Sequence, residues 1–250
     1  MLIDTHCHIL STEYDDINKI INETLNGEVD KIIINGYDLK SSKEAVFLAE
    51  KYDNVYAAVG ISPQNIDGVT DFEIEQIEKL CSSKKIVAIG EVGLDYYWTT
   101  DTKQRQIEIF EYMLTIAKKH KLPVIIHSRK AILDTYNLVK KYGVIGIMHC
   151  FSGSIEMAKE FIKLGFLIGV GGVITFKNSK EIKDVVSGIN LEDIALETDS
   201  PYLTPEPFRG RKNIPSYIIY VAEKIADLKG VTKEIVISKT SNAVTSKFDL

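Results

Sequence analysis

Short apolar runs recur along the chain, each followed by a longer amphipathic stretch, and this alternation restricts the possible folds. The runs are continuous and rich in β-branched residues, as in strands that are buried on both faces of a parallel sheet. Eight runs are found: Leu2–Ile3, Lys31–Asn35, Val55–Val59, Ile86–Gly90, Val124–His127, Val144–Met148, Phe166–Val170 and Ile194–Leu196. Between them, stretches such as Lys103–His120 place apolar residues three and four positions apart, which is the spacing of one helical face.

Two parallel α/β folds share this alternation: an open, doubly wound sheet and a closed (β/α)8 barrel. The chain has 250 residues, which is the usual length of a (β/α)8 barrel. No segment rich in proline, glycine or serine divides it into parts. We therefore predict an α/β protein with a single (β/α)8 TIM barrel domain over residues 1–250.

The overall charge argues against a broad basic surface for nucleic acid. The chain has 30 Lys and Arg against 35 Asp and Glu, a net charge of −5, whereas non-specific DNA-binding proteins usually present a broad basic face. A polyanionic substrate would have to be attracted by a local basic patch or by bound cations. The three cysteines are irregularly spaced, which predicts a reducing compartment. With no recognisable signal peptide or membrane span, we expect a cytoplasmic protein without an obligate protein partner.

Side chains that can bind metal gather at the ends of the predicted strands, where barrel enzymes have their active sites. Four of the chain's five histidines lie there, together with two carboxylates: His6, His8, Glu91, His127, His149 and Asp199. One His-x-His pair alone would be weak support for a metal site. Six such residues at one barrel mouth are different, because buried unpaired charges are costly and a metal ion is their usual compensation.

Six ligands exceed what one catalytic cation uses, since catalytic zinc typically has three protein ligands and an open position. We therefore expect two divalent cations about 3.5–4 Å apart that share one carboxylate, with Glu91 as the bridge. The expected ligands of the first ion are His6, His8, Glu91 and Asp199, and those of the second are Glu91, His127 and His149. Such mixed ligands suit Zn, Mn, Fe, Co or Ni more than Ca or Mg, although Mg stays among the candidates.

Other polar residues of the strand-end loops are candidates for substrate binding. Arg129 follows the fifth strand, Ser152 the sixth and Arg209 the eighth. Arginine can bind a phosphate through two donors at once, and Ser152 lies where the next helix is expected to begin, so that backbone N–H groups could face an anion. For both arginines, a solvated surface charge is an equal alternative. Asp199 is the expected general base, and Glu91 is the second catalytic residue.

Three aromatic residues, Tyr96, Tyr97 and Trp98, follow the fourth strand near the expected mouth. Each of these rings could stack on a nucleobase, an interaction worth about 1–3 kcal/mol per base. Each could equally pack the loop itself, and for Tyr96 packing is the favoured interpretation.

Five motifs together resemble the TatD-type deoxyribonucleases, within the wider group of amidohydrolase-like barrels. They are IDTHCH at 3–8, GEVGLDY at 90–96, LPVIIHSR at 122–129, HCFSG at 149–153 and LETDSPYL at 196–203, and the tail RGRKNIP at 209–215 fits as well. The resemblance implies a TIM barrel, divalent metal, and hydrolysis of DNA, often from the 3′ end of single strands. It also supports the ligand roles of the six residues above.

One residue departs from the family pattern, which usually has Gly-Ile-His-Pro after the third strand. Here the third of these residues is Ser62, a change that could alter substrate choice or rate. Three alternatives stay open: an amidohydrolase, an enzyme that cleaves another ester such as aminoacyl-tRNA, and a barrel that binds metal without catalysis. Amidohydrolases often bridge their metals with a carbamylated lysine, and Glu91 stands at that place. We therefore expect a 3′–5′ exonuclease that acts on single-stranded DNA through a metal-activated water.

Overall fold

In the computed structural model, which describes residues 1–250, eight parallel strands follow one another in chain order in one sheet. The strands are β1 (Ile3–Cys7), β2 (Lys31–Asn35), β3 (Val55–Val59), β4 (Ile86–Asp95), β5 (Val124–Arg129), β6 (Gly146–Met148), β7 (Leu167–Val170) and β8 (Ile194–Leu196). Three of them, β2, β3 and β8, have the predicted bounds. All eight predicted strands are present.

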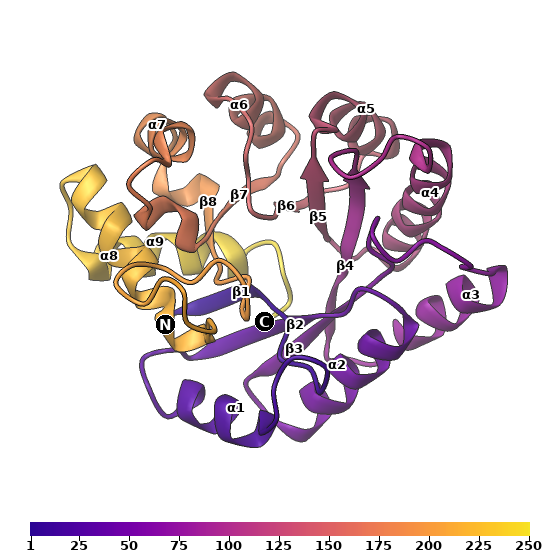
Figure 1. Ribbon diagram of the computed structural model, residues 1–250, viewed down its shortest axis with the longest axis horizontal. Coiled ribbons are helices and arrows are strands. Elements are labelled where there is room, and N and C mark those ends of the chain that lie inside the picture. The colour runs from indigo at the N-terminus through magenta and orange to yellow at the C-terminus, as the bar shows by residue number, and fades with distance from the viewer.

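The sheet closes between β1 and β8 through a short contact beyond the end of β8. Cys7 forms a parallel bridge with Ser200. The His8 N–H donates to the Ser200 carbonyl at 2.7 Å, and the Asp199 N–H donates to the His6 carbonyl at 2.9 Å. Figure 1 shows the strands inside a ring of helices. The prediction of a (β/α)8 barrel is therefore confirmed, and its closing contact lies among the predicted site residues.

Eight helices alternate with the strands: α1 (Ile17–Leu25), α2 (Leu39–Lys51), α3 (Asp71–Leu80), α4 (Lys103–His120), α5 (Ile132–Tyr142), α6 (Ile155–Lys163), α7 (Lys180–Gly188) and α8 (Ile218–Lys229). A ninth, α9 (Lys233–Thr245), follows them, and three short 3-10 helices are η1 (Gly172–Thr175), η2 (Leu191–Asp193) and η3 (Pro215–Tyr217). None of these helices is long and apolar enough to cross a membrane. Helix α4 has the predicted bounds, and its apolar residues Phe110, Leu114 and Ala117, spaced three and four positions apart, are buried.

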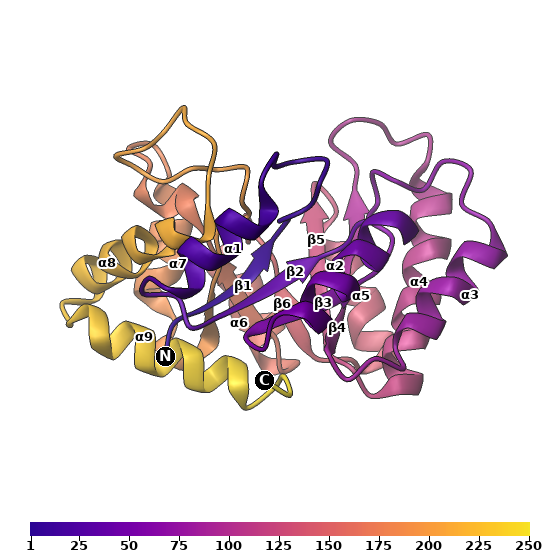
Figure 2. The ribbon, with the colours of Figure 1, turned by 90° about the horizontal axis from the view of Figure 1, so that it is seen from below.

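The barrel interior is filled with apolar side chains and is closed at one end. One buried cluster contains a residue from each of the eight strands, among them Ile3, Ile33 and Ile125, and packs against Val244 and Phe248 at the carboxyl end of the chain. Figure 2 shows α9 across the end of the barrel where the N-terminus lies, opposite the long loops that follow the strands. The predicted site residues lie at the end with those loops.

The strand pairing is irregular at two places that carry site residues. The register of β1 against β2 shifts between Asp4 and Cys7, and that of β4 against β5 shifts between Ile89 and Val92. Such irregularities re-aim side chains and are common beside active sites. The first shift contains His6 and the second contains Glu91, so both residues lie where the regular pairing of their strands is interrupted.

Strand β4 extends beyond Gly90, the end predicted for it, to Asp95. Its last residues pair with β5, and Gly93 lies opposite His127. A Cβ atom at Gly93 would lie 2.0 Å from the His127 carbonyl oxygen, and the residue has φ +139°. Glycine at this position therefore permits β4 to continue beside the site.

Candidate metal centre

The six side chains predicted as metal ligands lie together at the open end of the barrel. A cavity of about 620 Å³ opens there, lined in part by His8, Glu91, His127, His149 and Asp199. His6 lies beneath it and is fully buried. Residues from β1, β4 and β5, and from the loops after β6 and β8, thus meet at one point, as the strand-end argument predicted.

The first group of possible ligand atoms has the spacing that one cation requires. The Nε2 atoms of His6 and His8 are 3.1 Å apart. They lie 3.7 and 3.6 Å from Asp199 Oδ1, and 4.0 and 3.7 Å from Glu91 Oε2. Ligand atoms bound tetrahedrally at about 2.0–2.2 Å are about 3.4 Å from one another. Each of the two carboxylates is therefore placed to share a cation with the imidazoles of His6 and His8.

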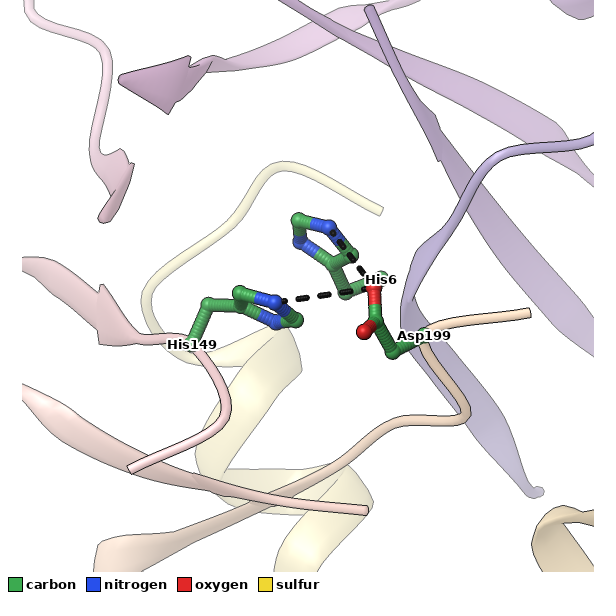
Figure 3. A group of neighbouring side chains, drawn as sticks. All are labelled: His6, His149 and Asp199. Carbon is green, nitrogen blue, oxygen red and sulfur yellow. Dashed lines mark ion pairs between the residues drawn. The ribbon is translucent and has the colours of Figure 1, made fainter. Parts of the chain in front are cut away.

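Asp199 also faces a third imidazole. The rings of His6 and His149 stack with their centroids 3.5 Å apart. Their Nε2 atoms lie 3.7 and 3.6 Å from Asp199 Oδ1, as the dashed lines in Figure 3 show. One carboxylate oxygen is thus nearly equidistant from His6, His8 and His149.

Glu91 faces two different sets of imidazoles with its two oxygens. Oε2 lies toward His6 and His8, whereas Oε1 lies 3.0 Å from His127 Nδ1. Glu91, His127 and His149 also place one ligand atom each within 4.8 Å of one another. A carboxylate that is shared between two groups of donors in this way is suited to bridge them.

Three of the histidines use one ring nitrogen to contact a carbonyl or carboxylate oxygen outside the six predicted ligands. Each of these contacts fixes the orientation of the ring. His8 Nδ1 donates to the Asn35 carbonyl at 2.9 Å, and His127 Nε2 lies 3.1 Å from an oxygen of Asp95. Likewise, His149 Nδ1 lies 3.1 Å from Glu197 Oε2. Partners of this kind are typical of metal-binding histidines, because they select the tautomer and direct the free nitrogen toward the ion.

The fourth histidine leaves a buried polar atom without a partner. His6 Nδ1 has no hydrogen-bond acceptor or donor within reach. An unpaired buried polar atom is costly. The other ring nitrogen, Nε2, faces three possible ligand atoms, on His8, Glu91 and Asp199. The imidazole and carboxylate donors around Nε2 fit a divalent cation.

Nearby carboxylates raise the pKa of two imidazoles and so favour their protonated form. Burial opposes a charge on His127, but hydrogen bonds to Asp95 and Glu91 outweigh it and raise its pKa to about 9. Burial also opposes a charge on His149, and the charge of Glu197 is the largest of the opposing effects that raise its pKa to about 10. A bound cation would replace these protons, since metal ligands must be deprotonated.

Burial favours the neutral form of two other groups in the site, His6 and Asp199. Burial, followed by the nearby imidazoles of His149 and His8, holds the pKa of His6 well below its usual value. Burial also raises the pKa of Asp199 to about 6. These shifts reflect the low polarity of the site, in which an added positive charge would interact strongly with the carboxylates.

The backbone at Asp199 adopts an uncommon left-handed conformation, with φ +55°. Aspartate tolerates this region better than most residues. The Asp199 N–H donates to the His6 carbonyl, and the Tyr202 N–H donates to the Asp199 carbonyl at 2.8 Å. Such strained residues cluster at functional sites, and here the conformation turns a carboxylate toward the imidazoles.

Of the three residues predicted to bind substrate, two line the cavity and one does not. Arg129 and Ser152 line the cavity. Arg209 does not, and its guanidinium lies over the Phe176 ring at 3.9 Å from the centroid. The predicted helix start at Ser152 is wrong, because Ser154 is the N-cap of α6 and accepts a hydrogen bond from the Met157 N–H.

Sequence reasoning did not single out Glu197, which the structure places directly behind the cluster. Its side chain is fully buried, and Oε1 accepts the Cys150 N–H at 2.6 Å while Oε2 contacts His149. A Cβ atom at Gly169 would lie 2.7 Å from Oε2, so glycine makes room for this carboxylate. Its place directly after β8 and two residues before Asp199 was the available indication.

We expect Glu197→Gln to weaken metal binding about 10- to 100-fold, because the amide holds the His149 ring less firmly and removes a negative charge. The measurement is the metal dissociation constant from calorimetric titration. Glu78→Gln is a matched control, since Glu78 lies 3.0 Å from His120 Nε2, a glutamate–histidine pair outside the cavity. Equal metal affinity in both variants would contradict the role of Glu197.

A (β/α)8 barrel with imidazoles and carboxylates gathered at its open end is the architecture of metal-dependent hydrolases. Comparison with known proteins makes this class more specific. The chain belongs to the TatD family, because the family model described as TatD related DNase matches residues 3–249.

Individual relatives agree with this assignment. YabD of Bacillus subtilis is 43% identical, with 96% of each chain covered, and YcfH of Escherichia coli K12 is 33% identical, covering 100% of this chain and 96% of its own. Both are described as uncharacterized metal-dependent hydrolases. The crystal structure of YjjV, a TatD homologue from the same E. coli strain, superposes with a TM-score of 0.92 at 30% identity, covering 100% of this chain and 98% of YjjV.

Proposed function

We propose that the protein is a deoxyribonuclease that removes nucleotides from the 3′ end of single-stranded DNA. The observation that carries this proposal is the position of Glu91 between two groups of imidazoles, below a cavity that also contains Arg129. A shared carboxylate suits the two-cation arrangement that is common in enzymes acting on phosphodiesters. The family description, TatD related DNase, supports the same class of substrate.

Two cations fit the ligand atoms better than one. The first would bind His6, His8, Glu91 and Asp199, whose facing atoms lie 3.1–4.0 Å apart where a histidine is one of the pair. The second would bind Glu91, His127 and His149. The second group has only three protein ligands, which leaves positions open for water and substrate. We regard Mn, Mg, Zn, Co and Ni as candidate metals.

Bound there, the cations would lower the pKa of a water molecule and offset the charge of the phosphate. Asp199 lines the cavity and lies among the imidazoles, where its carboxylate can accept the proton that the water loses. Arg129 presents a guanidinium in the same cavity for a phosphate oxygen. Glu197 and Asp95 keep the rings of His149 and His127 in position throughout.

The shape of the site supports cleavage at the end of a DNA strand. A cavity of about 620 Å³ has the size of a small-ligand site. It can hold a terminal nucleotide, whereas the bases of a duplex stay paired and stacked outside it. Ser62 lines the cavity and donates to Asn65 Oδ1 at 3.0 Å. A serine there occupies less space than the histidine usual in the family, which leaves more room beside the terminal nucleotide.

The test compares substrate classes on one preparation loaded with Mn or Mg. A labelled single-stranded oligonucleotide should be shortened from its 3′ end, and chelation should stop the reaction until metal is restored. Cyclic amides and aminoacyl-tRNA serve as competing substrates. Turnover of either one with an intact oligonucleotide, or activity that ignores the chelator, would contradict the proposed function.

A further inference from the structure

Two exposed aromatic side chains stand in the loop after β4. Trp98 is 71% exposed and Tyr97 is 50% exposed. Their neighbour Tyr96 differs, because its ring packs against the hydrophobic core and its hydroxyl donates to Asp134 at 3.0 Å. Loop packing therefore accounts for Tyr96 but not for the other two rings, which face solvent.

Arg129 connects this aromatic pair to the cavity. Its guanidinium lies 3.6 Å from the centroid of the Tyr97 ring and 5.5 Å from that of Trp98. The two rings meet edge to face, with centroids 4.9 Å apart. Because Arg129 also lines the cavity, the three side chains form one continuous surface from the cavity wall to the indole of Trp98.

The backbone of this surface is tied to the candidate metal centre. The Tyr97 N–H donates to Asp95 Oδ1 at 2.9 Å, while Asp95 Oδ2 lies 3.1 Å from His127 Nε2. The Tyr96 N–H donates to the Arg129 carbonyl at 2.9 Å. The backbone of Tyr96 and Tyr97 is thus linked to Arg129 and, through Asp95, to His127.

We propose that Tyr97, Trp98 and Arg129 form a base-stacking platform for single-stranded DNA. The proposal rests on the proposed function. The terminal nucleotide occupies the cavity, Arg129 contacts the phosphate that follows, and the next base stacks on Trp98. Arg129 covers one face of Tyr97, so the exposed indole is the free stacking surface. Stacking tolerates any base, and it supplies affinity to a chain with a net charge of −5.

Trp98 is the only tryptophan of the chain, so its emission reports on the platform directly. We expect a single-stranded oligodeoxynucleotide to quench this emission in the full-length Asp199→Asn variant, which should cut the DNA too slowly to matter during the measurement. A mononucleotide and a blunt duplex, which bring no free base to Trp98, should not quench it. Absence of quenching by the single strand at saturating binding would overturn the proposal, whatever the protein hydrolyses.

Kinetics provide the second test. Trp98→Ala should raise KM for the oligonucleotide about 5- to 150-fold with kcat unchanged, and Trp98→Phe should restore most of the loss. Hydrolysis of a small phosphodiester such as the p-nitrophenyl ester of thymidine 5′-phosphate should not change. Phe47→Ala is the matched control, because Phe47 is 65% exposed on α2, outside the cavity lining.

An abasic substitution identifies the base concerned. Removal of the base next to the terminal nucleotide should weaken wild-type binding as much as Trp98→Ala does, and should have no further effect in that variant. If removal of the base and Trp98→Ala weaken binding additively, the proposal is overturned. If the small phosphodiester is hydrolysed but Trp98→Ala has a normal KM, the platform is rejected and the proposed function stands. If no phosphodiester is hydrolysed, the proposed function fails, and the quenching experiment alone decides the platform.

Discussion

Replacement of Glu91 by glutamine is expected to reduce hydrolysis to background and to lower the bound metal. The two oxygens of Glu91 face different imidazoles, His6 and His8 on one side and His127 on the other. An amide offers one neutral oxygen and an N–H group, which repels a cation. Because one side chain serves both groups of ligands, a single substitution should disturb both sites at once.

The measurement for Glu91→Gln combines elemental analysis of the purified protein with the oligonucleotide assay. Glu78→Gln should retain the wild-type metal content and activity, since that glutamate pairs with Lys119 and His120 on the surface. The melting temperature in chelator should show that the barrel is still folded. Full activity in Glu91→Gln would be incompatible with a bridging role for this residue.

Asp199→Asn should lower kcat about 10²- to 10⁴-fold, the usual contribution of a general base, with a much smaller change in KM. The amide cannot accept a proton, although it keeps the size of the carboxylate. The cation between Glu91, His127 and His149 should still bind, because those three side chains are unchanged. The expected loss therefore lies mainly in the chemical step.

Steady-state kinetics on the small phosphodiester, with metal content measured in parallel, test the role of Asp199. Asp227→Asn is the control, since Asp227 is exposed on α8. A fall in kcat that excess metal fully restores would show that Asp199 acts only as a ligand. An unchanged kcat would remove Asp199 from the mechanism.

The barrel and the six clustered side chains could be predicted because each depends on short-range pattern. Strands buried on both faces appear as apolar runs, and parallel strands bring their carboxyl ends to one side. The sequence alone therefore indicated that His6, His127 and Asp199 would meet, although they are far apart in the chain.

The features of the structure that could not be predicted from the sequence depend on packing between distant segments of the chain. Strand β4 continues past Gly90 because Gly93 allows β5 to approach closely, and the sequence there resembles a loop. Glu197 is buried behind His149 because Gly169 leaves space for it. Arg209 lies over Phe176, away from the cavity lining. No local pattern encodes these contacts, since each requires the folded neighbour.

Crystals grown with Mn²⁺ and measured at the manganese absorption edge would test the two-cation site most directly. We predict two anomalous peaks about 3.5–4 Å apart. One should lie among His6, His8 and Asp199, and the other between His127 and His149, with Glu91 reaching both. A map without peaks at the barrel mouth, or with a single peak that contacts neither Glu91 nor His127, would contradict the proposed centre.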